Sequence, residues 1–212
     1  MTIEAIIFDL GGVVFDSPLA FIREYEERHG LPENLVARVV GGYGGEQGAW
    51  QRLERGELML PEFCEQLDRD VRALGAVMST ADLMQKMAEV HAVRPAMLGA
   101  IRKLRAGGLK VGALTNNWVT HEGYDEQMRP LREEFHAFVE SCKVGLRKPD
   151  PRIYAIACER LGISPSAAVF LDDIGGNLKV ARSLGMTTIK VGEPEAALRE
   201  LEKIVGFGLL PN

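Results

Sequence analysis

A small set of polar side chains follows short apolar runs of the sequence, where their types permit nucleophilic and ion-binding chemistry. The set consists of Asp9, Thr115, Asn116, Lys148, Asp172 and Asp173. Three carboxylates brought together would repel one another or take up protons. Mg²⁺ would resolve this conflict, because it binds carboxylates together with water and phosphate oxygens. A hydroxyl, a lysine and backbone N–H groups could then hold a phosphoryl group for attack by an aspartate.

Each of these residues alone also has a structural explanation. An aspartate at the end of a strand commonly forms a turn, and Asp172 and Asp173 could cap the helix that follows them. Thr115 and Asn116 could be turn residues, and Lys148 could be an exposed side chain. The chemical interpretation therefore depends on all of them meeting at one place.

Five apolar runs predict buried strands, and helical patterns separate them. The runs are Ala5–Phe8, Lys110–Leu114, Phe138–Glu140, Ala168–Leu171 and Thr187–Val191. Apolar runs that alternate with helices indicate an α/β fold with a Rossmann-like, doubly wound parallel sheet. Ligands of such sheets bind beyond the carboxyl ends of the strands, so the polar set is expected to converge there.

Residues 17–92 differ from the rest, because they contain helical patterns without a convincing strand. The patterns cover Pro18–His29, Pro32–Val40, Pro61–Leu74 and Thr80–Val90. The glycine-rich run 41–45 does not follow a strand, and we expect it to be a plain flexible loop. We predict a helical cap at 17–92 inserted into a discontinuous core domain made of 1–16 and 93–212.

The order of the polar motifs resembles that of the haloacid dehalogenase-like superfamily. The four motifs correspond to Phe8-Asp9, Leu114-Thr115-Asn116, Lys148-Pro149 and Leu171-Asp172-Asp173. The stretches 140–149 (ESCKVGLRKP), 170–179 (FLDDIGGNLK) and 197–203 (ALRELEK) look most similar to the phosphatase domain of soluble epoxide hydrolase and to the related domain of acyl-CoA dehydrogenase family members ten and eleven. The resemblance is close over 93–205, good over 3–16 and weak through the cap.

The resemblance implies a role for each motif residue. Asp9 would attack phosphorus and form an aspartyl-phosphate. The Asp9 carboxylate, the Gly11 carbonyl and Asp173 would bind Mg²⁺, with support from Asp172. The residues implied in holding the phosphoryl group are Thr115, Asn116 and Lys148, and Asn177 would orient the last motif.

One position departs from the family pattern. Most phosphatases of the superfamily have a second aspartate two residues after the nucleophile, which passes a proton to the leaving group, but Gly11 stands there in this chain. General acid catalysis contributes ~10²–10⁴-fold, so this loss weakens the assignment without abolishing it. Asp16 is an alternative donor, although a polar residue at the hinge into the cap is the simpler interpretation. Trp50 either packs between helices, which we favour, or lines a pocket.

We therefore predict a magnesium-dependent phosphatase that acts on a small phosphorylated metabolite. Two alternatives stay open. A haloacid dehalogenase also uses an aspartate nucleophile, but it needs no metal and would leave Asp172 and Asp173 unexplained. A non-catalytic module would retain phosphate or partner binding after the loss of its acid.

The composition limits partners and location. A formal net charge of −5 argues against a nucleic-acid partner. Three widely spaced cysteines offer no disulfide framework, which favours the cytoplasm, and no apolar run reaches the ~18 residues of a membrane span. We expect a small-molecule phosphate substrate as partner, and a homodimer is compatible with the sequence.

Overall fold

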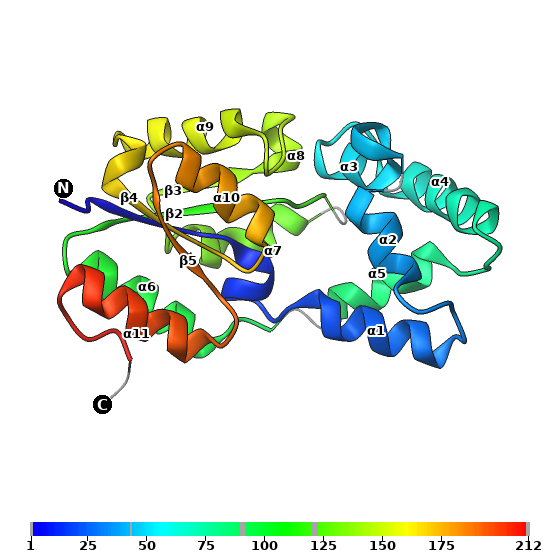
Figure 1. Cartoon of the computed structure of the whole chain (residues 1–212), viewed down its shortest axis with the longest axis horizontal. Coiled ribbons are helices and arrows are strands. Elements are labelled where there is room, and N and C mark those ends of the chain that lie inside the picture. Colours follow the sequence, from blue (N-terminus) through cyan, green and yellow to red (C-terminus); the bar gives the residue numbers. More distant parts are fainter. Residues whose placement is uncertain (1, 43, 90–91, 120–122, 211–212) are drawn as a thin grey trace.

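The computed structural model describes residues 2–42, 44–89, 92–119 and 123–210, and its centre is a five-stranded sheet of order β3-β2-β1-β4-β5 (Figure 1). All of the strand pairs are parallel. The strands are β1 (Ala5–Phe8), β2 (Lys110–Thr115), β3 (Ala137–Glu140), β4 (Ala168–Asp172) and β5 (Thr187–Lys190). Each predicted strand is present, and every end lies within one residue of its prediction.

Helices cover both faces of the sheet. Those of this part of the chain are α6 (Pro95–Ala106), α7 (Tyr124–Arg132), α8 (Ser141–Val144), α9 (Pro151–Leu161), α10 (Gly175–Ser183) and α11 (Pro194–Val205). Ile6 and Phe8 of β1 point into a hydrophobic cluster with α6 and α11, whereas Ala5 and Ile7 point into a second cluster with α9 and α10. A parallel strand buried on both faces is apolar at nearly every position, which explains the apolar runs of β1 and β4. The predicted α/β fold is therefore confirmed.

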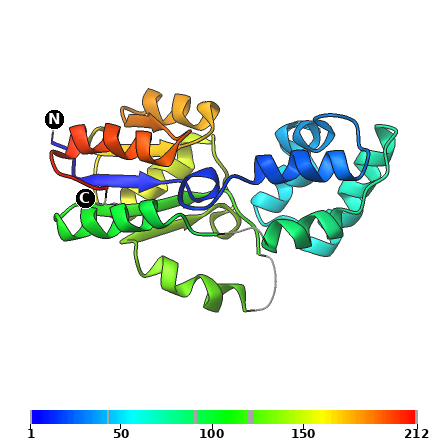
Figure 2. The same ribbon diagram turned by 90° about the horizontal axis from the view of Figure 1, so that it is seen from below.

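A group of helices lies to one side of the sheet and packs around a cluster of its own (Figure 2). These helices are α1 (Pro18–Arg28), α2 (Leu35–Gly42), α3 (Ala49–Glu54), α4 (Leu60–Ala73) and α5 (Thr80–Glu89). Phe63, Leu67 and Leu83 are fully buried at the centre of this cluster. We refer to α1–α5 as the cap, while the domain boundaries at residues 16 and 93 stay a prediction. Within the described ranges, no helix is long and apolar enough to cross a membrane.

The glycine-rich run of the cap was predicted as a plain loop, and that prediction is wrong in part. Gly41 and Gly42 end α2, Gly45 begins a short 3₁₀ turn, and Tyr43 lies outside the described residues. The unpredicted helix α3 follows directly after Gly48. It has only six residues, too few for a helical period to be recognised, and it forms because its apolar side chains pack into the cap cluster. Val90, at the predicted end of α5, also lies outside the described residues.

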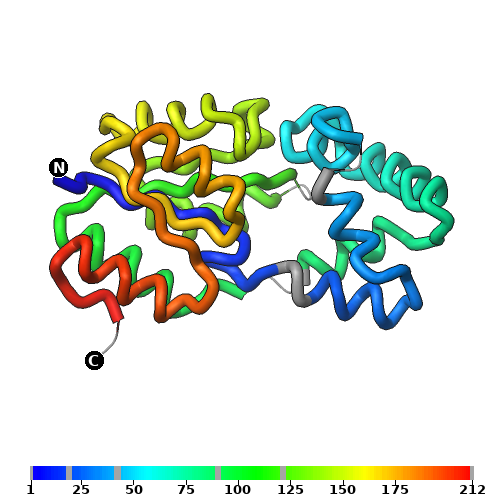
Figure 3. The backbone as a smooth tube through the Cα atoms, viewed as in Figure 1, coloured from blue at the N-terminus to red at the C-terminus, as the bar shows by residue number. Residues whose placement is uncertain are grey.

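The two chain segments that connect the cap to the sheet lie against each other (Figure 3). Phe15 and Val93 form an antiparallel bridge, and the Arg94 backbone N–H donates to the Val14 carbonyl at 2.8 Å. The Arg94 guanidinium forms an ion pair with Asp16 at 3.0 Å. The two segments that connect the cap to the sheet are thus hydrogen-bonded to each other just beyond β1.

Candidate active site

Asp9 directly follows the central strand β1, and its carboxylate is buried against Lys148. The Lys148 Nζ lies 2.8 Å from Asp9 Oδ1 and 2.8 Å from Asp172 Oδ2. The Lys148 residue is only 1% exposed. A buried ammonium is costly unless it is paired, so these two carboxylates fix its position. They also raise the pKa of Lys148, although burial acts in the opposite direction.

Asp172 and Asp173 are adjacent in the sequence but have different surroundings. Asp172 ends β4 with no exposed surface, and its oxygens accept hydrogen bonds from the Ile174 backbone N–H at 2.7 Å and from the Asn177 amide at 3.0 and 3.1 Å. Asp173 is half-buried and lies against Gly12. A Cβ at Gly12 would approach Asp173 Oδ2 to 2.3 Å, and Gly12 has φ +74, so glycine is required there.

The three carboxylates form a group that fits a divalent cation. Oxygens of Asp9, Asp172 and Asp173 all lie within 4.8 Å of one another. Lys148 contributes one positive charge against three carboxylates, so the group carries an excess of negative charge. Burial raises the pKa of both Asp9 and Asp173, and the charge of Asp172 raises both further, while Lys148 lowers them. Hard carboxylate oxygens with uncompensated charge are the donor set that Mg²⁺ prefers.

The structure also brings Thr115 and Asn116 to this place. Thr115 is the last residue of β2, and its buried side chain faces the same cavity as Asp9 and Lys148. The Asn116 side chain is occupied by the backbone of Lys148: its Oδ1 accepts from the Lys148 N–H at 2.7 Å, and its Nδ2 donates to the Lys148 carbonyl at 3.0 Å. Asn116 therefore fixes the backbone at Lys148. A contact of Asn116 with a phosphoryl group would have to come from the Asn116 backbone.

A cavity of about 640 Å³ adjoins these residues and is lined by both the core and the cap. Its polar lining includes Asp9, Thr115, Asn116, Lys148, Asp173 and Asn177. The remaining wall is largely apolar and includes Leu10, Phe15, Ile22, Val40, Trp50, Met84, Met87, Val93, Leu98, Trp118, Met128 and Leu131. Trp50 belongs to the cap cluster and also lines the cavity, so both interpretations of this residue hold.

Two acidic residues could replace the proton donor that is absent at Gly11, and the structure places them differently. The Asp16 side chain is 55% exposed and paired with Arg94 at the hinge, and it is not among the residues that line the cavity. Glu54, which belongs to none of the sequence motifs, lines the cavity from the end of α3 and is buried. A glutamate in a short helix gives no signal in the sequence that it points inward rather than into solvent.

Comparison with known proteins agrees with this geometry. A family model described as haloacid dehalogenase-like hydrolase matches residues 3–185, which include the four motifs. The chain belongs to the haloacid dehalogenase-like hydrolases. The resemblance carried by its motifs is confirmed.

Several relatives are much longer than this chain. It is 40% identical over 216 residues to acyl-CoA dehydrogenase family member 10 of Mus musculus, which covers 99% of this chain and 20% of the relative. It is 34% identical over 223 residues to bifunctional epoxide hydrolase 2 of Sus scrofa, with coverages of 99% and 40%. The chain thus spans less than half the length of these two proteins.

Other matches are similar in size to this chain. A phosphatase of Mycobacterium tuberculosis is 29% identical over 188 residues, covering 88% of this chain and 86% of the relative. The structure of a haloacid dehalogenase family enzyme of Bacteroides thetaiotaomicron, in complex with magnesium and inorganic phosphate, is 21% identical with a TM-score of 0.62. It covers 90% of this chain and 94% of that one, which shows that the two share a fold.

Proposed function

We propose that this hydrolase is a magnesium-dependent phosphatase that forms an aspartyl-phosphate on Asp9. The observation that carries the proposal is the position of Asp9 beside a buried lysine and within a group of three carboxylates, at the wall of a cavity beyond the strand ends. An aspartate paired with a lysine can attack phosphorus, and the lysine can stabilise charge on the phosphoryl oxygens. As the bond to Asp9 forms, the P–O bond to the ester alcohol would break and the alcohol would leave with a proton from solvent. Water would then hydrolyse the aspartyl-phosphate to inorganic phosphate and restore the Asp9 carboxylate.

The surrounding residues have complementary roles in this proposal. Asp9, the Gly11 carbonyl and Asp173 would hold Mg²⁺, with Asp172 supporting them. The bound ion would neutralise and orient the phosphate. The Thr115 hydroxyl would donate to a phosphoryl oxygen, and the backbone beyond it, at Asn116, would add a further N–H donor. Asp172 would hold the Lys148 ammonium in place, and its hydrogen bonds with Ile174 and Asn177 would fix the backbone on either side of Asp173.

The cavity lining supports a proposal for the alcohol part of the substrate ester, which we call its body. Most of the wall is apolar, and Asp9, Lys148 and Asp173 are charged groups of the site itself. Glu54, Arg102 and Glu134 also line the cavity. Burial of apolar surface contributes ~25 cal/mol per Å², so an ester with an apolar alcohol would gain more affinity than a strongly polar one. We therefore propose a small phosphate monoester with an apolar body as the substrate class.

The test is hydrolysis of an aryl phosphate and of a 2-haloacid, each with Mg²⁺ and with a chelator. We expect release of phosphate only with Mg²⁺ and no release of halide. Release of halide with the metal chelated would favour a dehalogenase. Binding of a phosphate analogue without turnover of any ester would favour the non-catalytic module.

A further inference from the structure

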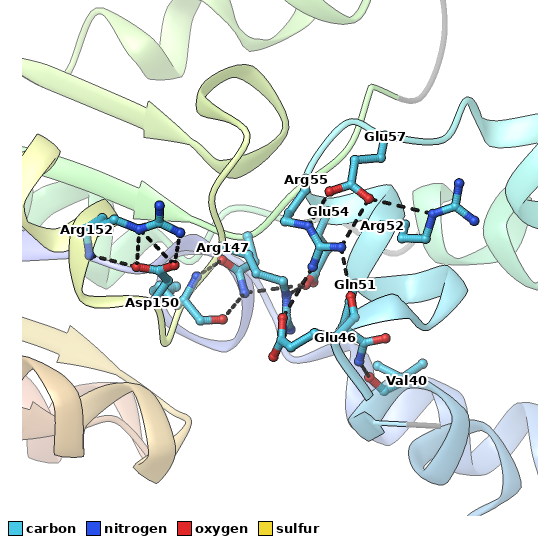
Figure 4. A network of polar contacts seen from close by, with 12 residues as sticks. Val40, Glu46, Gln51, Arg52, Glu54, Arg55, Glu57, Arg147, Asp150 and Arg152 are labelled. Atoms are coloured by element: carbon cyan, nitrogen blue, oxygen red, sulfur yellow. Dashed lines mark hydrogen bonds and ion pairs between the residues drawn. The ribbon is translucent and has the colours of Figure 1, made fainter. Parts of the chain in front are cut away.

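A buried carboxylate of the cap contacts the core beside Lys148. Glu54 is the last residue of α3 and is 6% exposed. Its Oε2 lies 2.6 Å from Nε of Arg147 and 3.4 Å from Nδ2 of Asn116, while its Oε1 accepts from the Trp50 indole N–H at 3.0 Å. Figure 4 shows the Glu54 and Arg147 side chains meeting between cap and core.

Both core partners of Glu54 are connected to the lysine of the site. Arg147 precedes Lys148 in the chain, and Asn116 holds both the N–H and the carbonyl of Lys148. The Lys148 ammonium in turn lies 2.8 Å from the Asp9 carboxylate. A displacement of Arg147 or Asn116 would therefore move the ammonium relative to the nucleophile.

The turn after α3 packs closely on the core, which presents Glu54 at a defined position. Gly56 has φ +69, and a Cβ there would lie 2.4 Å from the carbonyl oxygen of Cys142 in α8. Arg55 is fixed within the cap by an ion pair with Glu57 at 2.6 Å (Figure 4). The end of α3 and its turn thus rest against the same core segment that leads to Arg147.

Glu54 belongs to the cap and Arg147 to the core, so their buried ion pair forms only when the cap is docked on the core. A buried carboxylate is costly without a partner, and Arg147 supplies the opposite charge from the core. We propose that Glu54 is a positioning residue that couples docking of the cap to the placement of Lys148 for phosphoryl transfer. This inference rests on the proposed function. In this proposal Glu54 acts through Arg147 and Asn116, although it lines the same cavity as Asp9.

The first test compares Glu54→Gln with a matched control, Glu57→Gln. The first variant keeps the size of the side chain but removes the charge that holds Arg147. The second removes a charge that pairs with Arg55 and Arg52 inside the cap. A displacement of about 1 Å in an active site can lower the rate ~10²-fold, so we expect Glu54→Gln to lower kcat on an aryl phosphate by about tenfold or more, with little change in KM. Glu57→Gln should retain the wild-type kcat.

A double-variant cycle tests whether Glu54 acts through Arg147. Arg147→Gln should lower kcat to a similar extent, and the combination of Glu54→Gln with Arg147→Gln should lose little more than either single variant. The combination leaves no unpaired charge, so it also serves where a single variant unfolds. Arg147→Lys, which keeps the charge, should recover part of the rate. Additive losses, or a wild-type kcat in the folded double variant, would overturn the proposal.

The two tryptophans of the chain offer a readout that does not depend on turnover. Trp50 in α3 and Trp118 beyond β2 have ring centroids 5.3 Å apart and an interplanar angle of 70°. Their coupling in near-ultraviolet circular dichroism should change in Glu54→Gln and remain in Asp9→Asn. If the wild type is active and Glu54→Gln changes neither the spectrum nor kcat, the positioning role of Glu54 is refuted but the proposed function stands. A wild type that hydrolyses no phosphate ester would refute the proposed function and, with it, this inference.

Discussion

At the residue scale, substitution of the two adjacent aspartates of the last motif is expected to have different effects, on stability for Asp172 and on Mg²⁺ binding for Asp173. Asp172→Asn breaks the buried pair with Lys148 and should lower the free energy of unfolding by roughly 3–5 kcal/mol. Asp173→Asn removes one of three repelling carboxylates, so stability should be kept, but the Mg²⁺ concentration for half-maximal activity should rise more than in Asp172→Asn. Urea unfolding and Mg²⁺ titration of both variants measure these effects. A larger metal defect in Asp172→Asn would mean that the two roles are reversed.

The glycine at the acid position is free to accept a side chain. Gly11 has φ −65, and, apart from Gly11 and its two chain neighbours, no described residue has an atom within 4 Å of the position of a Cβ there. Gly11→Asp should therefore fold and supply the missing proton donor. We expect alkyl phosphates, which have poor leaving groups, to gain up to ~10²-fold in kcat, and aryl phosphates to gain less.

Asp16→Asn is the matched control for this substitution, because Asp16 is paired with Arg94 at the hinge. Its ratio of alkyl to aryl rates should equal that of the wild type. A stable Gly11→Asp protein with an unchanged ratio would show that the proton comes from another group.

At the scale of single elements, α7 offers a way to test the apolar substrate body. Met128 of α7 lines the cavity and is only partly buried, so Met128→Gln should leave the fold intact. Full burial of a methionine contributes ~1.5–3 kcal/mol, so KM for a long-chain alkyl phosphate should rise by about tenfold. KM for a phosphate ester with a short body should change little. Equal changes for both esters would contradict an apolar subsite at α7.

Elements also differ in how far the sequence predicted them. The strands β1 to β4 were predictable because they are short, largely apolar runs. Parallel strands then bring Asp9, Thr115 and Asp172 to one edge. The helix α3 was not predictable, since six residues after a glycine-rich run carry no recognisable period. Consequently Glu54 could be found only from the packing of cap on core, whereas the cavity role of Trp50 was one of the two interpretations that the sequence left open.

At the scale of the whole molecule, the cap and the sheet have separate hydrophobic clusters. Leu67→Ala removes a fully buried side chain from the cap cluster and should cost ~2–5 kcal/mol. If the predicted division at residues 16 and 93 is right, amide hydrogen exchange should accelerate in α1–α5 and much less in β1–β5. Equal acceleration in both parts would show that the chain unfolds as one unit.

The identity of the nucleophile is the central claim, and trapping the covalent intermediate tests it most directly. The enzyme is mixed with an aryl phosphate and Mg²⁺, quenched in acid during turnover and digested, and its peptides are analysed by mass spectrometry. We predict a phosphoryl group on Asp9, absent when Mg²⁺ is chelated and absent in Asp9→Asn, whose turnover falls to background. A phosphoryl group on a different residue, or wild-type turnover by Asp9→Asn, would contradict the account.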